Sequence, residues 1–332
     1  MTTPAVLAID GGNSKTDVAL VDQDGSVLAA ARGGGSSPQN SSIEHMLAQL
    51  SSLVGQVCTA AGAPLGDGPV ALQLAAYLAG ADLPVEEEQL KVALAGTGWA
   101  KQTTVSNDTF ALLRAGSPSG WGVAVVCGAG INCVGIAPDG TVTRFPALGV
   151  LSGDWGGGSG LGEQALWSAI RAEDGRGPAT MLQAGIADHF GRATVAEVSA
   201  AIHLGAEDAA RLVDLVPVLF ECADRGDAVA IALVERMADE IVLMGGVALR
   251  RLGLEHAEAA VVLGGGVLTA RNARLLDAVY LGFAAAAPRA VPQLVDVPPI
   301  VGAALLGLDA LGLAGPAEEA RLRAHFRAPA AG

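Results

Sequence analysis

Short apolar runs, separated by glycines and acidic turns, fill the first thirty residues. They predict strands at Val6–Asp10, Thr16–Asp22 and Val27–Arg32, with the dipeptide Asp24-Gly25 as the hairpin turn between the last two. The first two strands are joined by the polar segment DGGNSKT, which begins at Asp10. A segment this rich in glycine and polar side chains fits a hairpin turn that cups a ligand, although DGG by itself also fits a plain tight turn.

A helix and two further strands complete the pattern of the first half. Ser41 and Glu44 have the spacing of a capping box, and apolar residues then recur at helical intervals. The next strand is expected at Val70–Leu78, and Asp82 is expected to cap the acidic helix that follows it. The last strand of this half and its polar end are Thr103–Ser106 and Asn107-Asp108.

The second half repeats this order of elements. A strand, a glycine loop, a second strand, an Asp-Gly turn and a third strand follow one another, as they do at the amino terminus, which indicates an internal duplication at domain scale. The turn-rich segment 116–120 marks the boundary between the halves. Helices dominate from Leu161 to Leu252. The other expected elements are strands Gly122–Cys127, Cys133–Ala137, Thr141–Phe145, Ala260–Leu263 and Val291–Val295, and helices Arg271–Ala285, Pro299–Leu311 and Glu318–Phe326.

Composition and charge narrow the classes of function. The chain has 332 residues, 16% of them charged, and a net charge of -14, so nucleic acids and anionic membranes would be repelled. The uncharged stretch from Ser117 to Pro138 contains five glycines and fits two buried strands better than a membrane span. The four cysteines form no CxxC pair, which argues against structural zinc and favours reduced thiols in a cytoplasmic protein without a secretory signal.

Three glycine runs together indicate a nucleotide site. Successive amide N–H groups of the first run are able to bind one phosphate, and the carboxylate of Asp10 beside a triphosphate would need a cation between them, which suggests Mg²⁺ held through water. A second run, residues 128–130, lies on the matching hairpin of the second half. Two phosphate loops that face each other would hold one ATP. A third run, between a buried strand and a helix, allows an adenine or ribose to lie against the backbone. The candidate nucleotide-binding residues are Gly11, Gly12, Asn13, Ser14, Lys15, Gly128, Ala129, Gly130, Gly264, Gly265 and Gly266.

The order of DGGNSKT, GAGIN, the GDWG segment from Gly153, GGGV and the closing PIVGAALLG resembles the BadF/BadG-type ATPase family of the sugar kinase, Hsp70 and actin superfamily, in particular its N-acetylglucosamine kinase-like branch. The resemblance covers nearly the whole chain. It implies an α/β fold with two ribonuclease-H-like, actin/hexokinase-type domains that flank an ATP cleft. The domains are expected at residues 1–116 and 117–315, the second with a helical insertion, and the helix over 316–327 is expected to return to the first domain. A homodimer formed through the second domain is also expected.

The resemblance assigns chemistry to two further acids. Asp108 would be the general base that accepts the proton of a sugar hydroxyl during its attack on the γ-phosphate, and a role of Asp108 as a helix N-cap stays open beside this one. Asp154 lies in a loop with six glycines and would bind sugar hydroxyls, with an Asx turn as the simpler interpretation. The other expected sugar-binding residues are Ser37, Asn40, Asn107 and Asn132.

Several positions depart from the pattern of the family, and they bear on the substrate. An asparagine is moved, two hydroxyls are lost, and a tryptophan and an acid are replaced. Phosphate binding by the backbone is kept, whereas the identity of the sugar stays open. The sequence therefore predicts an Mg²⁺-dependent kinase for a hexose or amino sugar, with N-acetylglucosamine or glucosamine, at the 6-hydroxyl, as first candidates. The alternatives are an ATPase that activates a 2-hydroxyacyl-CoA dehydratase through an iron–sulfur cluster, and a non-catalytic sugar-sensing protein. The departures are Ser37, Ala129, Ile131, Leu148 and Trp155.

Overall fold

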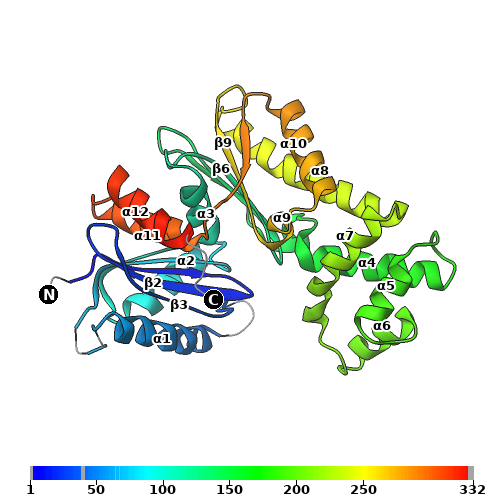
Figure 1. Ribbon diagram of the computed structural model, residues 1–332, viewed down its shortest axis with the longest axis horizontal. Helices are drawn as coiled ribbons and strands as arrows, with labels where there is room; N and C mark the ends of the chain where they lie inside the picture. Colours follow the sequence, from blue (N-terminus) through cyan, green and yellow to red (C-terminus); the bar gives the residue numbers. More distant parts are fainter. Residues whose placement is uncertain (1–2, 39–41, 64, 67, 328–332) are drawn as a thin grey trace. The chain divides into compact units, whose positions relative to one another are not determined.

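The chain forms two compact units, which Figure 1 shows as ribbons. The first comprises Met1–Ala124, Val134–Pro146 and Val295–Gly332, and the second comprises Val125–Cys133 and Ala147–Leu294. No helix among the residues described is both long and apolar enough to cross a bilayer. The structure, a computed structural model, describes residues 3–38, 42–63, 65–66 and 68–327.

The first unit is built on a mixed five-stranded sheet of β1 (Val6–Gly11), β2 (Lys15–Val21), β3 (Val27–Gly34), β4 (Ala71–Leu78) and β5 (Ala100–Asn107). The strand order is β3-β2-β1-β4-β5. The pairs β1–β2 and β2–β3 are antiparallel, whereas β1, β4 and β5 run parallel. The three parallel strands therefore end at the same edge of the sheet, which is the edge that carries the candidate site.

Helices cover both faces of this sheet. They are α1 (Ile43–Ala60), α2 (Pro84–Ala95), α3 (Asp108–Gly116), α11 (Ile300–Ala310) and α12 (Pro316–Arg327). Because side chains alternate along a strand, Leu7 and Ile9 of β1 pack with α1 and α2, and their neighbours Val6 and Ala8 pack with α3 and α11. Burial of one such aliphatic side chain contributes roughly 1.5–3 kcal/mol, so the two cores together fix the sheet that presents the site.

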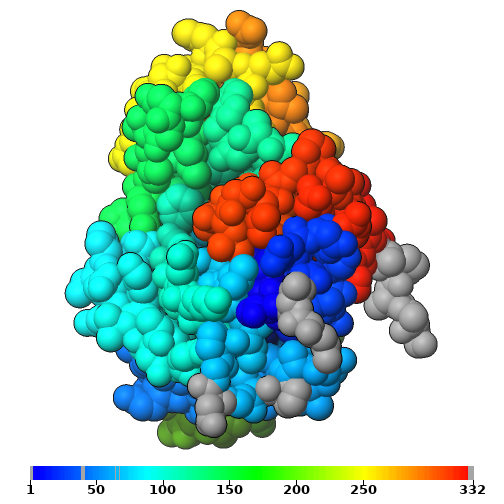
Figure 2. All heavy atoms as spheres, turned by 90° about the vertical axis from the view of Figure 1, so that its left-hand side faces the viewer, coloured from blue at the N-terminus to red at the C-terminus, as the bar shows by residue number. Residues whose placement is uncertain are grey.

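The two carboxyl-terminal helices pack beside the amino-terminal strands. A Cβ atom on Gly302 of α11 would lie only 1.8 Å from the carbonyl oxygen of Ala111, so α11 crosses α3 at backbone distance. Arg321 of α12 pairs with Asp24 in the turn between β2 and β3 at 2.8 Å. In Figure 2 this orange and red segment lies against the blue amino-terminal segment. The last two helices therefore pack as part of the first unit.

The first turn of α1 is capped by a hydroxyl. The side chain of Ser42 accepts a hydrogen bond from the backbone N–H of His45 at 3.2 Å. The capping box predicted from Ser41 and Glu44 cannot be compared with this, because residue 41 lies outside the described residues.

The second sheet contains β6 (Gly122–Cys127), β7 (Ile131–Ile136), β8 (Val142–Arg144), β9 (Ala260–Gly264) and β10 (Val291–Leu294), in the order β10-β9-β6-β7-β8. Both sheets therefore have the same order when read from their third strand: third, second, first, fourth, fifth. This confirms the duplication that the repeated strand and glycine pattern predicts, and it confirms the α/β class.

Helices make up most of the second unit. Two of them, α8 and α10, pack closely, because a Cβ atom on Gly245 of α8 would lie 2.6 Å from the ring of Phe283 in α10. The elements outside the sheet, including two 3₁₀ helices, are η1 (Gly149–Ser152), α4 (Gly157–Glu173), α5 (Leu182–His189), α6 (Val195–His203), η2 (Ala209–Leu215), α7 (Val216–Asp224), α8 (Ala228–Arg251), α9 (Gly266–Thr269) and α10 (Ala273–Ala286).

Candidate active site

Three acids lie at the carboxyl edge of the parallel strands in the first unit. Asp10 is near the end of β1, Asp82 follows β4 by four residues, and Asp108 directly follows β5. Asp10 and Asp82 are buried, with 8% and 7% of their surface exposed, and Asp108 is partly exposed. Ligands of open α/β sheets bind at this edge, so the position suits a reaction site.

The acids perturb one another. Burial raises the pKa of Asp10 to about 8, and the negative charges of Asp108 and Asp17 add to this shift. Burial also raises the pKa of Asp108 to about 7, with a further contribution from the charge of Asp82. Clustered carboxylates with raised pKa values in a partly closed site are typical of catalytic and cation-binding positions.

An ion pair beside Asp10 was not anticipated from the sequence. In the sheet register Asp10 lies opposite Asp17, and Asp17 lies opposite Arg32. Arg32 donates through Nε and Nη2 to the two carboxylate oxygens of Asp17, at 2.6 and 2.9 Å. The pairing of the predicted strands could have indicated that Asp10, Asp17 and Arg32 are neighbours, since side chains opposite each other on neighbouring strands share one face.

In the loop over residues 12–15 the last three residues are exposed. It is closed by a 2.9 Å hydrogen bond from the N–H of Gly12 to the last residue of the loop, and Gly12 accepts at its carbonyl from the N–H of Ser36 at 3.1 Å. A Cβ atom on Gly11 would lie 2.6 Å from the side chain of Leu78 and 2.9 Å from the hydroxyl of Ser36, so a larger residue there would have to displace these side chains. The loop is thus a supported backbone turn at the sheet edge.

Asn107, not Asp108, caps α3. Its Oδ1 accepts a hydrogen bond from the backbone N–H of Thr109 at 3.0 Å, and its Nδ2 donates to Oδ1 of Asp82 at 2.8 Å. The cap role expected for Asp82 is therefore wrong, because α2 has Leu83 as its N-cap. The cap role left open for Asp108 is also wrong, because Asp108 is the first residue of α3. At the first position of a helix the dipole favours the negative form of a carboxylate.

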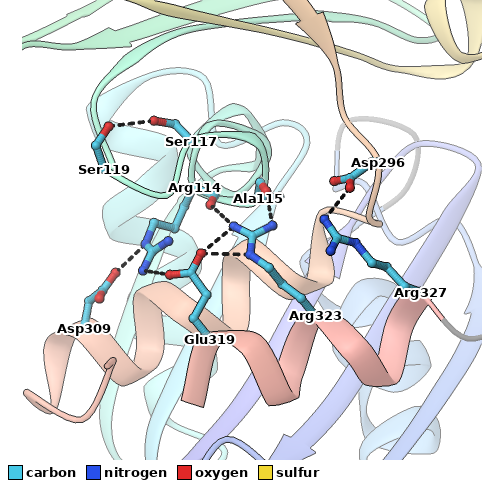
Figure 3. Close-up of polar contacts among 9 residues, drawn as sticks. All are labelled: Arg114, Ala115, Ser117, Ser119, Asp296, Asp309, Glu319, Arg323 and Arg327. Carbon is cyan, nitrogen blue, oxygen red and sulfur yellow. Dashed lines mark hydrogen bonds and ion pairs between the residues drawn. The ribbon is translucent and has the colours of Figure 1, made fainter. Parts of the chain in front are cut away.

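The far end of α3 is anchored by the carboxyl-terminal helices (Figure 3). The buried guanidinium of Arg114 pairs with Asp309 of α11 at 2.9 Å and with Glu319 of α12 at 3.0 Å, and Arg323 donates to the carbonyl of Ala115 at 2.6 Å. Burial acts to raise the pKa of Glu319, but its hydrogen bonds from Arg114 and Arg323 outweigh this and hold the pKa below its usual value. Helix α3, and Asp108 at its start, is thereby fixed at both ends.

In the second unit the glycine loop 128–130 contacts the start of α4. The N–H of Gly158 donates to the carbonyl of Gly128 at 2.7 Å. Gly157 has a φ of 71°, and a Cβ atom on it would lie 2.5 Å from the backbone of Gly130. Both the positive φ and the close approach require glycine, which accounts for part of the glycine content of this segment.

The third glycine run packs on the same loop. Gly265 has a φ of 90°, and a Cβ atom on it would lie 2.3 Å from the carbonyl oxygen of Cys127. Within the second unit, the structure thus brings together the runs 128–130 and 264–266, which lie far apart in the sequence. Their contact is backbone against backbone, a surface that is able to bind a ligand through amides.

Asp154 and Trp155 have defined partners in the second unit. The carboxylate of Asp154 accepts from the hydroxyl of Ser152 at 2.6 Å, and its N–H donates to the carbonyl of Gly149 at 3.0 Å. The ring of Trp155 stacks beneath the guanidinium of Arg236 at 4.0 Å. The loop is therefore locally ordered, with the carboxylate of Asp154 held by a short hydroxyl bond.

The remaining expected sugar-binding residues are placed as follows. Ser37 is buried in the first unit with 3% of its surface exposed. Asn40 lies outside the described residues. Asn132, in β7 of the second sheet, accepts at Oδ1 from the N–H of Cys133 at 2.7 Å. Asn107 lies directly beside the acids of the first unit, since it donates a hydrogen bond to Asp82.

The donor set at Asp10 fits a magnesium ion held in part by other ligands. A cation would favour ionised Asp10 and offset the repulsion from Asp108 and Asp17. Within the described part of the chain, no group of three or more His, Cys, Asp or Glu side chains is arranged to hold a metal. Mg²⁺ commonly binds proteins through one or two carboxylates and completes its shell with water and phosphate oxygens, which is what this position permits.

Two proteins named as kinases are similar to this chain over most of its length. An N-acetylmuramic acid/N-acetylglucosamine kinase of Clostridium acetobutylicum is 25% identical over 267 residues, which are 80% of this chain and 86% of that protein. An N-acetyl-D-glucosamine kinase of Dictyostelium discoideum is 25% identical over 323 residues, 93% of this chain and 99% of that protein. Distant homologues of this chain are thus named as N-acetylglucosamine kinases.

The fold is also found among solved structures. A candidate N-acetylglucosamine kinase of Chromobacterium violaceum superimposes with a TM-score of 0.74 at 24% identity, over 92% of this chain and 99% of that chain. The match confirms the expected two-domain fold of actin/hexokinase-like sugar kinases. The model of the BadF/BadG/BcrA/BcrD ATPase family matches residues 7–307, and the chain therefore belongs to this family of ATPases.

Proposed function

We propose that this protein is an ATP-dependent sugar kinase with Asp108 as its general base. The observation that carries the proposal is the pair of acids with raised pKa values, Asp10 and Asp108, at the carboxyl edge of the first sheet beside the loop 12–15. A phosphoryl-transfer site needs an acceptor for the proton and a means to neutralise phosphate charge, and these two acids suit the two tasks. The kinases among its relatives support the same reaction class.

The proton has a defined destination in this mechanism. The sugar hydroxyl oxygen forms a bond to the γ-phosphorus while the bond from that phosphorus to the bridging oxygen breaks, ADP leaves with the electron pair, and the hydroxyl proton passes to the carboxylate of Asp108. Because burial places the pKa of Asp108 at about 7, a useful fraction is ionised at neutral pH and remains basic enough to take the proton.

ATP would be bound chiefly by backbone. The loop Gly11–Lys15 of the first unit, and the packed runs 128–130 and 264–266 of the second, are the proposed nucleotide-binding residues. Asp10 would hold Mg²⁺ through water, and the ion, when bound, would neutralise charge on the phosphates. The side chain of Lys15 would add a cation near the phosphates.

The sugar would be bound by polar side chains. Asp154 is proposed to accept hydrogen bonds from sugar hydroxyls, with Asn107, Asn132, Ser37 and Asn40 as further contacts. N-acetylglucosamine or glucosamine, phosphorylated at the 6-hydroxyl, is the first candidate, in line with the names of the relatives. The substitution of Trp155 for an acid in this loop makes a related hexose the next candidate.

The alternative of a dehydratase activator has no support at the cysteines. All four cysteines are buried, whereas an iron–sulfur cluster shared between two subunits needs cysteines at the subunit surface.

A sugar panel tests the proposal. ADP release from Mg²⁺-ATP is measured with N-acetylglucosamine, glucosamine, N-acetylmannosamine, glucose and no sugar, for the wild type, Asp108→Asn and the exposed control Asp239→Asn. We expect sugar-dependent turnover in the wild type and the control, and a loss of at least about 100-fold in Asp108→Asn with nucleotide affinity retained. Wild-type turnover in Asp108→Asn would remove the base assignment. ADP release that no sugar stimulates would remove the kinase assignment.

A further inference from the structure

We propose that Asp82 is a positioning residue for the general base, acting through Asn107; this inference rests on the proposed function. Asp82 lies 25 residues before Asn107 in the sequence and is joined to it by a 2.8 Å hydrogen bond. Both side chains are buried, with 7% and 1% of their surface exposed. The contact links the loop after β4 to the start of α3, where Asp108 is the first residue.

The hydrogen bonds continue from Asn107 into the helix. The Nδ2 group of Asn107 donates to Asp82, so the amide is oriented with Oδ1 toward α3. That Oδ1 accepts from the backbone N–H of Thr109 at 3.0 Å and from its hydroxyl at 2.5 Å. Asp108 stands between these two residues, so its backbone is held on both sides by one side chain. The orientation of the Asn107 amide, and with it the cap, depends on an acceptor at position 82.

Asp82 is itself held in place from two sides. Its N–H and that of Leu83 donate to one carboxylate oxygen of Glu86, at 3.1 and 2.8 Å. Arg144, in β8, donates to the carbonyl oxygens of residues 81 and 82 at 3.0 Å each and pairs with Glu87 at 2.9 Å. All of these residues belong to the first unit.

Arg144 connects the segment that carries Asp82 to helix α3. Its guanidinium also lies over the ring of Phe110, a residue of α3, at 5.6 Å from the centroid. One cation thus contacts both the segment that carries Asp82 and the helix that begins with Asp108. The opposite end of α3 is held separately by Arg114 (Figure 3). The start of α3 therefore has its own anchor, and Asp82 is the acceptor at its centre.

The expected consequence is on turnover rather than on binding. A displacement of about 1 Å in a catalytic group is able to cost on the order of 100-fold in rate, because the reacting atoms lose their alignment. Asp82 also adds to the negative charge around Asp108. A side chain that keeps the acceptor but not the charge separates these two effects.

The test compares two substitutions at one position. Asp82→Asn keeps an Oδ1 acceptor for Asn107, whereas Asp82→Ala removes it. We expect kcat to fall 10- to 100-fold in Asp82→Ala and less than 3-fold in Asp82→Asn, with KM for both sugar and ATP within 2-fold of the wild type. If both variants are equally impaired, or if KM for the sugar rises in proportion to the loss, Asp82 acts by charge or by direct contact and the proposal is overturned.

A second measurement does not depend on turnover. Hydrogen–deuterium exchange of the amides of residues 109–112 reports the order of the first turn of α3. We expect at least 5-fold faster exchange in Asp82→Ala and wild-type exchange in Asp82→Asn, with the amides of α10 unchanged in both as the check on folding. Equal protection in all three proteins overturns the proposal. A wild type that phosphorylates no sugar would refute the proposed function, and the exchange comparison would still decide the role of Asp82.

Discussion

The buried carboxyl of Asp10 makes the ligand-free protein less stable as the pH rises, and Asp10→Asn should remove that cost. The folded-state pKa of about 8 lies above the ordinary value of 3.8. Between these pH values the folded protein retains a proton that the unfolded chain has lost, so the stabilisation present below the lower value is lost as the pH rises through the higher one. The asparagine side chain has nearly the same shape and does not titrate.

The size of the effect follows from the shift. At about 1.4 kcal/mol for each pKa unit, the penalty at pH 7 is about 4 kcal/mol as an upper bound. Local relaxation and water penetration reduce such penalties, so we expect Asp10→Asn to be more stable than the wild type by about 2 kcal/mol at pH 7.5. Near pH 4.5 the expected advantage is below about 1 kcal/mol, because the carboxyl is largely protonated in the folded state and titrates only partly in the unfolded state.

Urea unfolding followed by circular dichroism measures this difference at pH 4.5, 6 and 7.5 for the wild type, Asp10→Asn and the exposed control Asp239→Asn. The variant should gain stability relative to the wild type as the pH rises, and the control should show no such trend. A constant difference across the three pH values, or a variant less stable at pH 7.5, would refute the assignment of a desolvated acid at Asp10. Saturating Mg²⁺-ATP should narrow the gap at pH 7.5, since bound ligand stabilises the ionised wild type selectively.

Three further outcomes are expected. Gly302→Ala should lower the free energy of unfolding by about 2 kcal/mol or more, because its Cβ would meet the carbonyl of Ala111 at 1.8 Å. The control Gly246→Ala, in open space on α8, should be neutral or stabilising by up to about 1 kcal/mol in the same urea titration. Equal effects of the two substitutions would contradict this packing. Ala147→Gly should raise stability by about 0.5 kcal/mol, since Ala147 has a φ of 53°, and an unchanged or lower thermal midpoint would argue against strain there. The rate kcat/KM should fall tenfold per pH unit below about pH 7 as Asp108 becomes protonated, and a flat profile from pH 5.5 to 8 would exclude it as the base.

Local patterns in the sequence predicted the elements of the fold well. The hairpin strands around residue 11 lie within two residues of their expected bounds, because each is a short apolar run between glycine or acidic turns. The duplication could be predicted for the same reason, since both halves repeat the order of strand, glycine loop and strand. Neither inference required knowledge of contacts between distant residues.

The network around Asp108 could not be predicted in this way. Asn107 and Asp108 are adjacent and both are good N-cap residues, so only the backbone conformation decides which one caps α3. The partner of Asn107 lies at Asp82, 25 residues away, and the contact depends on β4 and β5 being neighbours. The anchor at Arg144 is more distant still and has no local signal.

Direct detection of the product tests the central claim most sharply. The wild type is incubated with Mg²⁺-ATP and N-acetylglucosamine or glucosamine, and the sugar and nucleotide are quantified together by mass spectrometry, with Asp108→Asn in parallel. We predict one sugar phosphate for each ADP formed by the wild type and almost none in the variant. ADP that accumulates without any phosphorylated sugar, for these and the other sugars of the panel, would contradict the assignment of this chain as a sugar kinase.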